Sequence, residues 1–148
     1  MHVATTYNRY ILTGIGGSKE QVVVFPDAFV SSIIVVDRSS IMPVPFYDRA
    51  IAGLIHHQGS VIPLVILRRV LGEISAMLSE TFAVVHLSAL AGGLEGVGLV
   101  VDRVLSSIPA GQYTPSSDHL SVEVLMAQLP LQLWQPQRWH SYARSDIQ

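Results

Sequence analysis

The chain has 148 residues, of which 49% are apolar and only 14% are charged, with no cysteine and a formal net charge of -2. The lack of cysteine excludes disulfide frameworks, thiolate zinc sites and cysteine nucleophiles, and the scattered arginines argue against nucleic acid as a partner. Charged residues usually make up roughly 25% of a soluble domain, so we expect an apolar surface, and such a surface usually meets a partner.

The first half of the chain predicts short β-strands within a single domain. Valine- and isoleucine-rich segments separated by glycine, serine, proline and aspartate are typical of an all-β barrel. Tyr10–Ile15 and Gln21–Phe25 flank GGSKE and predict a hairpin, and Ser32–Arg38 predicts a third strand. The prolines of Met42–Phe46 predict an extended connection. Tyr47–Leu54 predicts a short helical turn, which Gly53 would break.

The second half adds three predicted strands, Ser60–Leu67, Phe82–Leu87 and Val97–Val104. AGGLEG supplies a hairpin turn between the last two, and the stretch 68–80 fits a loop or a short helix interrupted at Gly72. After Thr114 two alternatives stay open, because 123–129 fits a helix capped by Ser117 or Asp118, and VEVLM also fits a strand. The closing segment LQLWQPQRWHSYARSDIQ carries no periodic signal.

The N-terminal sequence bears on the compartment. MHVATTYNRY lacks the charged start and apolar core of a secretory signal, so we expect a cytoplasmic protein. The longest uncharged apolar stretch, Ile51–Leu67, is interrupted by HHQGS and Pro63 and is shorter than a membrane span. Direct membrane insertion is therefore not expected.

Histidines are the candidate metal ligands. The adjacent His56 and His57 would point to opposite faces of a strand, so they cannot hold one ion together without a turn between them. A metal site would need one of them to converge with His86, His119 or His140. A small β-barrel metal-binding protein or enzyme of this kind is the alternative to an interaction module.

No other motif gives positive evidence of catalysis. GIGGSK at Gly14–Lys19 fits neither a dinucleotide fingerprint nor a P-loop, and no serine lies in a G-x-S-x-G sequence. Asp102, inside the apolar run VVDRV, is expected to pair with Arg103 or Arg68, because an unpaired charge in a strand is costly. We expect neither an enzyme nor a bound cofactor.

Four segments of the chain follow a recognisable order. They are FPDAFV at 25–30, PVP at 43–45, GLIHHQGSVIPLVILR at 53–68 and GLVVDRV at 98–104. In this order they resemble the CheW-like domain, the chemotaxis coupling adaptor family. Its members carry L-P-x-x-x-V, a proline-rich stretch, G-x-x-N-L-R-G-x-V-x-P-V-x-D-L-R and G-L-x-V-D-x-V. The resemblance covers 10–114 of a single domain spanning 1–148, and 115–148 is a divergent C-terminal segment.

The resemblance implies two small five-stranded β-barrels packed together and a non-catalytic signalling adaptor. One surface would engage the regulatory domain of a CheA-type histidine kinase, and a groove between the barrels would take the cytoplasmic tip of a chemoreceptor. The pathway would be chemotaxis-like, with pilus-driven motility or phototaxis as further settings. The positions implied in protein interaction are Val30, Ser32, His57, Gln58, Gly59, Arg68 and Asp102.

Three positions of the chain depart from the family pattern. HHQG replaces N-L-R-G and would be the turn at the receptor groove, with Gln58 where the family usually has arginine. Ile66 stands where it usually has aspartate, so neither position makes a charge-assisted hydrogen bond. Ser32 falls where well-known members carry glutamate. The family's closing strands are not recognisable after Thr114.

Overall fold

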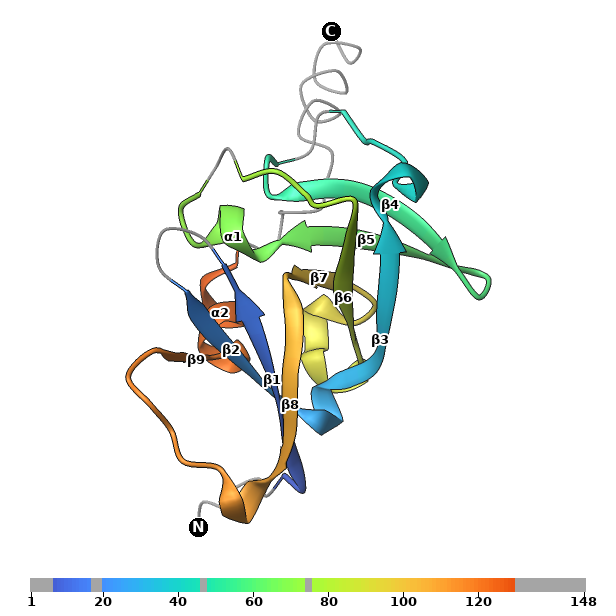
Figure 1. Cartoon of the computed structure of the whole chain (residues 1–148). Helices are drawn as coiled ribbons and strands as arrows, with labels where there is room; N and C mark the ends of the chain where they lie inside the picture. The colour runs from blue at the N-terminus through green and yellow to red at the C-terminus, as the bar shows by residue number, and fades with distance from the viewer. Residues whose placement is uncertain (1–6, 17–19, 46–47, 74–75, 130–148) are drawn as a thin grey trace, which may run out of the picture.

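The computed structural model describes residues 7–16, 20–45, 48–73 and 76–129, which form two curled sheets (Figure 1). Lobe 1 is a sheet of order β8-β1-β2-β9, built from β1 Arg9–Ile15, β2 Gln21–Pro26, β8 Arg103–Pro109 and β9 His119–Ser121. Lobe 2 is a sheet of order β3-β6-β7-β5-β4, built from β3 Val30–Asp37, β4 Ile51–His57, β5 Ser60–Ile66, β6 Thr81–Leu87 and β7 Gly98–Val101. The all-β, two-lobed prediction is confirmed. Lobe 2 has five strands, and lobe 1 has four among the described residues.

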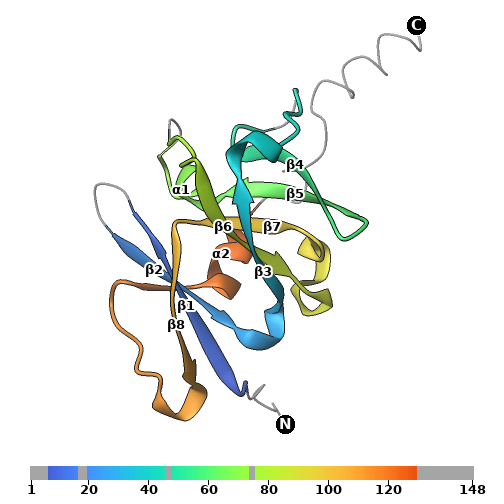
Figure 2. The same cartoon turned by 45° about the vertical axis from the view of Figure 1, so that its right-hand side comes forward.

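Short helices join the strands. They are η1 Asp27–Phe29, η2 Arg38–Ser40, α1 Leu67–Val70, η3 Ala89–Leu94, η4 Ala110–Gln112 and α2 Val122–Gln128. In Figures 1 and 2, α2 lies against β2 and β9 of lobe 1, as the contacts between these elements also show. No helix in the described part of the chain is long and apolar enough to cross a membrane.

The strands of lobe 2 are consecutive in the chain and lie between the two halves of lobe 1. β1 and β2 precede β3, whereas β8 and β9 follow β7. As a result β1 pairs with β8, from Arg9↔Pro109 to Gly14↔Arg103, although all the strands of lobe 2 lie between them in the sequence. Lobe 2 is in effect an insertion between the second and third sequential strands of lobe 1.

Two apolar cores meet at β6 and β7. The larger core extends through lobe 1 and the junction between the lobes and includes Val85 and Leu99, whereas the smaller one fills lobe 2 and includes Val84 and Val100. Because successive strand residues point to opposite faces, each of these strands serves both cores. This explains why FAVV and GLVV are continuous apolar runs instead of alternating ones.

A bridge between Met42 and Leu54 closes lobe 2. The Met42 N–H donates to the Leu54 carbonyl at 2.8 Å, and the Leu54 N–H donates back at 2.9 Å. The bridge links the segment after β3 to β4, at opposite ends of the five-stranded order. Gly53, at φ +146°, lies against the Met42 carbonyl so closely that a Cβ would overlap it. Only glycine leaves room for this closure.

Several predicted strands agree with the structure. The β1–β2 hairpin is confirmed with Ile15 opposite Gln21, although residues 17–19 of its loop lie outside the described residues. The strands β5 and β6 start within one residue of their predicted positions, and β3 begins two residues earlier, at Val30. The short helix predicted within 68–80 corresponds to α1, after which Gly72 takes a φ of +113°. AGGLEG does join two antiparallel strands, with η3 forming the connection.

Two predictions were wrong. In place of the helical turn predicted over 47–54, the described residues from 48 onward form a local turn, in which Asp48 accepts the Ala50 N–H at 2.9 Å. β4 then begins at Ile51, and its first five residues alternate between buried and half-buried. The strand over 97–104 is two strands, because the chain passes from lobe 2 to lobe 1 at Asp102. Neither glycine nor proline marks this crossing in the sequence.

The segment after Thr114 completes lobe 1. β9 pairs in parallel with β2, and α2 buries Val122 and Leu125 in the larger core. The helical alternative for 123–129 is confirmed, but its N-cap is Ser121, whose hydroxyl accepts the Glu123 N–H, and not Ser117 or Asp118. The sequence from 130 onward lies outside the described residues.

Candidate interaction surfaces

The HHQG segment is the turn of the β4–β5 hairpin. His57 pairs with Ser60, and the two residues between them have positive φ, +49° for Gln58 and +80° for Gly59. Two such residues in a two-residue loop are the signature of a type I′ turn, which matches the twist of the flanking strands. Figure 1 shows this turn at the tip of the β4–β5 hairpin. Gln58 and Gly59 are exposed, so the turn presents a surface and holds no closed site.

The histidines among the described residues do not come together. His56 is exposed and His57 half-buried on successive positions of β4, and His86 lies on β6 opposite Ser32. His119 lies in lobe 1 and shares a hydrogen bond with Tyr113. No group of three or more histidines, aspartates or glutamates is placed to hold a metal ion among the described residues, which do not include His140.

Arg68 is paired within its own segment. It follows β5 in α1, and its Nη2 lies 2.9 Å from Glu73 Oε2, with Nε at 3.3 Å from the same oxygen. Both side chains line a cavity of about 340 Å³ with Gly16 and Gln21, which lie at the loop end of the β1–β2 hairpin. Because the guanidinium already has a carboxylate partner, Arg68 chiefly holds the turn after β5 in shape.

Asp102 does not form the predicted ion pair. Its partners would have been Arg103 or Arg68, but Arg103 pairs with Glu20 and Arg68 with Glu73. Instead, Asp102 Oδ2 accepts the backbone N–H of Gly16, and the Asp102 N–H donates to the Gly14 carbonyl at 3.0 Å. Asp102 therefore fastens the crossing between the lobes to the end of β1, and Arg68 and Asp102 both lie beside Gly16.

Val30 and Ser32 lie at the start of β3 and point to opposite faces. Val30 is opposite Leu87 and packs against the larger core, whereas Ser32 is opposite His86, the preceding residue of β6. The bulge at Ser31 separates the two positions. Because Val30 is partly buried in the core, a charge placed there would disturb folding as well as any contact.

An exposed apolar surface lies along the junction of the lobes. Ile33 and Val35 are 40% and 78% exposed on β3, opposite Val85 and Ala83, which pack on the larger core. Val104 lies on β8, opposite Thr13 of β1, and is 40% exposed on the core-facing side of lobe 1. We call Ile33, Val35 and Val104 the inter-lobe apolar surface; β8 runs beside β6 in Figures 1 and 2.

The sequence did not single out these three residues. SIIVV holds four consecutive apolar residues, and Val104 follows the charged Asp102 and Arg103, so alternation could not separate outward from inward side chains. The signal that was available is the low charge content, which predicts an apolar surface without locating it.

Comparisons with known proteins give one family model and similar solved structures. The family model described as the CheW-like domain matches residues 10–115. Among solved structures, the chain is similar to the scaffolding protein TtCheW from Thermoanaerobacter tengcongensis, with a TM-score of 0.54 and 21% sequence identity. That match covers 76% of this chain and 68% of the other. No curated protein matches the chain.

Proposed function

Because the chain belongs to the CheW-like domain family, whose members are chemotaxis scaffolds and adaptors, we propose that it couples a CheA-type histidine kinase to chemoreceptors. The observation that carries this proposal is the family match over 10–115. In this role the protein is a single non-catalytic domain that works in the cytoplasm, held at receptor arrays by its partners. The pathway is chemotaxis-like, and the kinase contact is with the regulatory domain.

The receptor tip docks, in this proposal, on the inter-lobe apolar surface. A receptor tip is a coiled-coil hairpin, and an amphipathic helix commonly places its apolar face against such a surface. Val30 and Ser32 lie at one end of the strand that carries Ile33 and Val35, so the positions implied by the family adjoin this surface. His57, Gln58 and Gly59 contribute the exposed β4–β5 turn as a second contact.

Arg68 and Asp102 have a different part in the proposal. Their polar groups are engaged with Glu73 and with the Gly16 N–H, so they shape the junction between the lobes. Their substitution is therefore expected to act on binding through the position of the lobes and not through a lost contact.

Calorimetric titration tests the coupling role. The purified protein is titrated with the regulatory domain of the CheA-type kinase encoded beside it and, separately, with the tip of a receptor from the same genome. We expect micromolar binding to the kinase domain, about -8 kcal/mol. Absence of binding to both partners, with co-elution also negative, would overturn the proposal.

Val35→Asp tests the receptor surface. The side chain is 78% exposed, so the free energy of unfolding should change by less than about 0.5 kcal/mol. Burying the new carboxylate against an apolar helix face should weaken receptor-tip binding at least about tenfold. Val124→Asp, on α2 and 56% exposed, is the matched control and should bind as the parent protein does. Unchanged receptor binding by Val35→Asp would place the receptor elsewhere.

A further inference from the structure

A second cavity lies on lobe 1, outside the surfaces described above. It has a volume of about 240 Å³ and opens beside the segment that leads into β9. Its lining residues are Tyr10, Val24, Pro26, Tyr113, Pro115, Ser116, His119, Ser121 and Glu123. Several of them belong to the part of the chain beyond the family match, which ends at 115.

Three aromatic rings form one side of this cavity. The Tyr10 and Tyr113 ring centroids are 5.0 Å apart at an interplanar angle of 45°, and the His119 ring stacks on Tyr113 at 5.7 Å and 14°. The Tyr113 hydroxyl and His119 Nδ1 share a hydrogen bond of 2.8 Å, which fixes the two rings relative to each other. The cavity is thus lined by ordered π systems above the apolar Val24 and Pro26.

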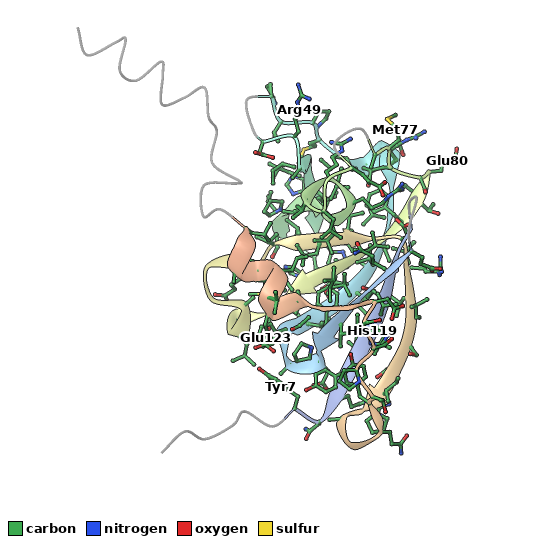
Figure 3. The ribbon with its side chains drawn as sticks, turned by 90° about the vertical axis from the view of Figure 1, so that its left-hand side faces the viewer. Tyr7, Arg49, Met77, Glu80, His119 and Glu123 are labelled. Atoms are coloured by element: carbon green, nitrogen blue, oxygen red, sulfur yellow. The ribbon has the colours of Figure 1, made fainter. Side chains whose placement is uncertain are left out.

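The charge at the cavity is negative. Glu123 is exposed and lines it, and no lysine or arginine among the described residues does. The ion pairs among the described residues are Arg68–Glu73 and Arg103–Glu20, so the Glu123 carboxylate has no cationic partner within that part of the chain. Figure 3 shows His119 and Glu123 in the same part of the molecule as Tyr7.

The tyrosines report the same environment. Burial raises the pKa of Tyr113 above its usual value, and Tyr10 and the Asp118 carboxylate raise it further. Burial also raises the pKa of Tyr7, with Glu123 adding to the effect. Negative charge therefore acts on Tyr113 from Asp118 and on the nearby Tyr7 from Glu123.

We propose that this cavity binds the guanidinium group of an arginine side chain presented by a protein partner. A cation is attracted both by the faces of tyrosine rings and by an unpaired carboxylate. Arginine fits better than lysine because its planar guanidinium group stacks on aromatic rings and donates a bidentate pair of hydrogen bonds to a carboxylate. An anionic ligand would meet Glu123 without any lining cation. None of the lining residues belongs to the inter-lobe apolar surface or to the β4–β5 turn.

Nuclear magnetic resonance titration of the whole chain with Nα-acetylarginine amide tests the proposal. We expect saturable shifts of the ring signals of Tyr10, Tyr113 and His119, with millimolar affinity and weaker binding of Nα-acetyllysine amide. Nα-acetylalanine amide, which lacks the cation, should leave these signals in place. Absence of saturable ring shifts with the arginine probe, or equal shifts with the alanine probe, would overturn the proposal.

Two variants test the parts of the site. Glu123→Gln keeps the shape of the side chain and should weaken binding of the arginine probe about threefold to fivefold. Glu95→Gln, at an exposed acidic residue between η3 and β7, is the matched control and should leave binding unchanged. Tyr113→Phe retains the ring but loses the hydroxyl, so it should still bind. Undiminished binding by Glu123→Gln would show that the carboxylate takes no part and would overturn the site as drawn.

Discussion

Replacement of Gly53 by alanine should open lobe 2. The φ of +146° lies outside the regions that alanine favours, a strain of roughly 1–3 kcal/mol. The new methyl group would also overlap the Met42 carbonyl and the Ile41 side chain, so the Met42–Leu54 bridge must separate. Each of its two hydrogen bonds is worth about 1 kcal/mol, which brings the expected loss to about 3–5 kcal/mol.

The assay is urea unfolding followed by far-ultraviolet circular dichroism, with Gly59→Ala as the matched control. Gly59 also has a positive φ, +80°, but nothing lies within 4 Å of a Cβ built there. The control therefore carries only the backbone strain, about 1 kcal/mol. If the two variants lost the same free energy, the close approach at Met42 would contribute nothing, and our account of how lobe 2 closes would be refuted.

Three further predictions concern the turn, the crossing and an exposed carboxylate. Gln58→Gly should raise the free energy of unfolding by about 0.5–1 kcal/mol in urea, because Gln58 holds a φ of +49° that glycine adopts without strain; a loss of stability would contradict the type I′ assignment. Asp102→Ala should lower it by about 1 kcal/mol, since the Gly16 N–H then loses its acceptor and is left to water, and the control is Asp27→Ala, at an aspartate whose side chain makes no hydrogen bond within the described part of the chain. The Ser116 hydroxyl, which donates to Asp118 at 2.6 Å, and the Asp118 backbone lower the pKa of that carboxyl below 3.8. The stabilisation is therefore present above pH 3.8 and is lost as the pH falls through the folded pKa, so Asp118→Asn should remove this part of the acid dependence measured by thermal unfolding.

The sequence predicted those elements whose ends are marked chemically. GGSKE between two apolar runs marked the first hairpin, whereas at the turn of Gln58 and Gly59 only the following strand, from Ser60, was expected. The crossing at Asp102 could not be predicted, because neither glycine nor proline stands at or beside it in VGLVVDRV. The chain leaves one sheet there because Asp102 finds hydrogen-bond partners far away in the sequence. These partners are Gly14, in β1, and Gly16, the residue that follows β1.

The candidate site was predictable in part for the same reason. Motif order located Gln58, Arg68 and Asp102, but their partners Glu73 and Gly16 depend on how the lobes meet. The exposure of Ile33 and Val35 depends on where lobe 1 stops covering the sheet, which no local pattern encodes. The cavity with Tyr10, Tyr113 and His119 likewise joins residues about a hundred positions apart.

The insertion of lobe 2 between β2 and β8 has a consequence for biosynthesis. Residues 30–101 hold every strand of lobe 2, so that sheet can assemble as soon as they have left the ribosome. The β1–β2 hairpin emerges first but gains its neighbours β8 and β9 last. During translation its apolar face is therefore without its final partners while about a hundred residues are added, at roughly 5–20 residues per second. In this protein the first hairpin made is among the last to be completed, and that interval is when a chaperone would have an unfinished sheet edge to protect.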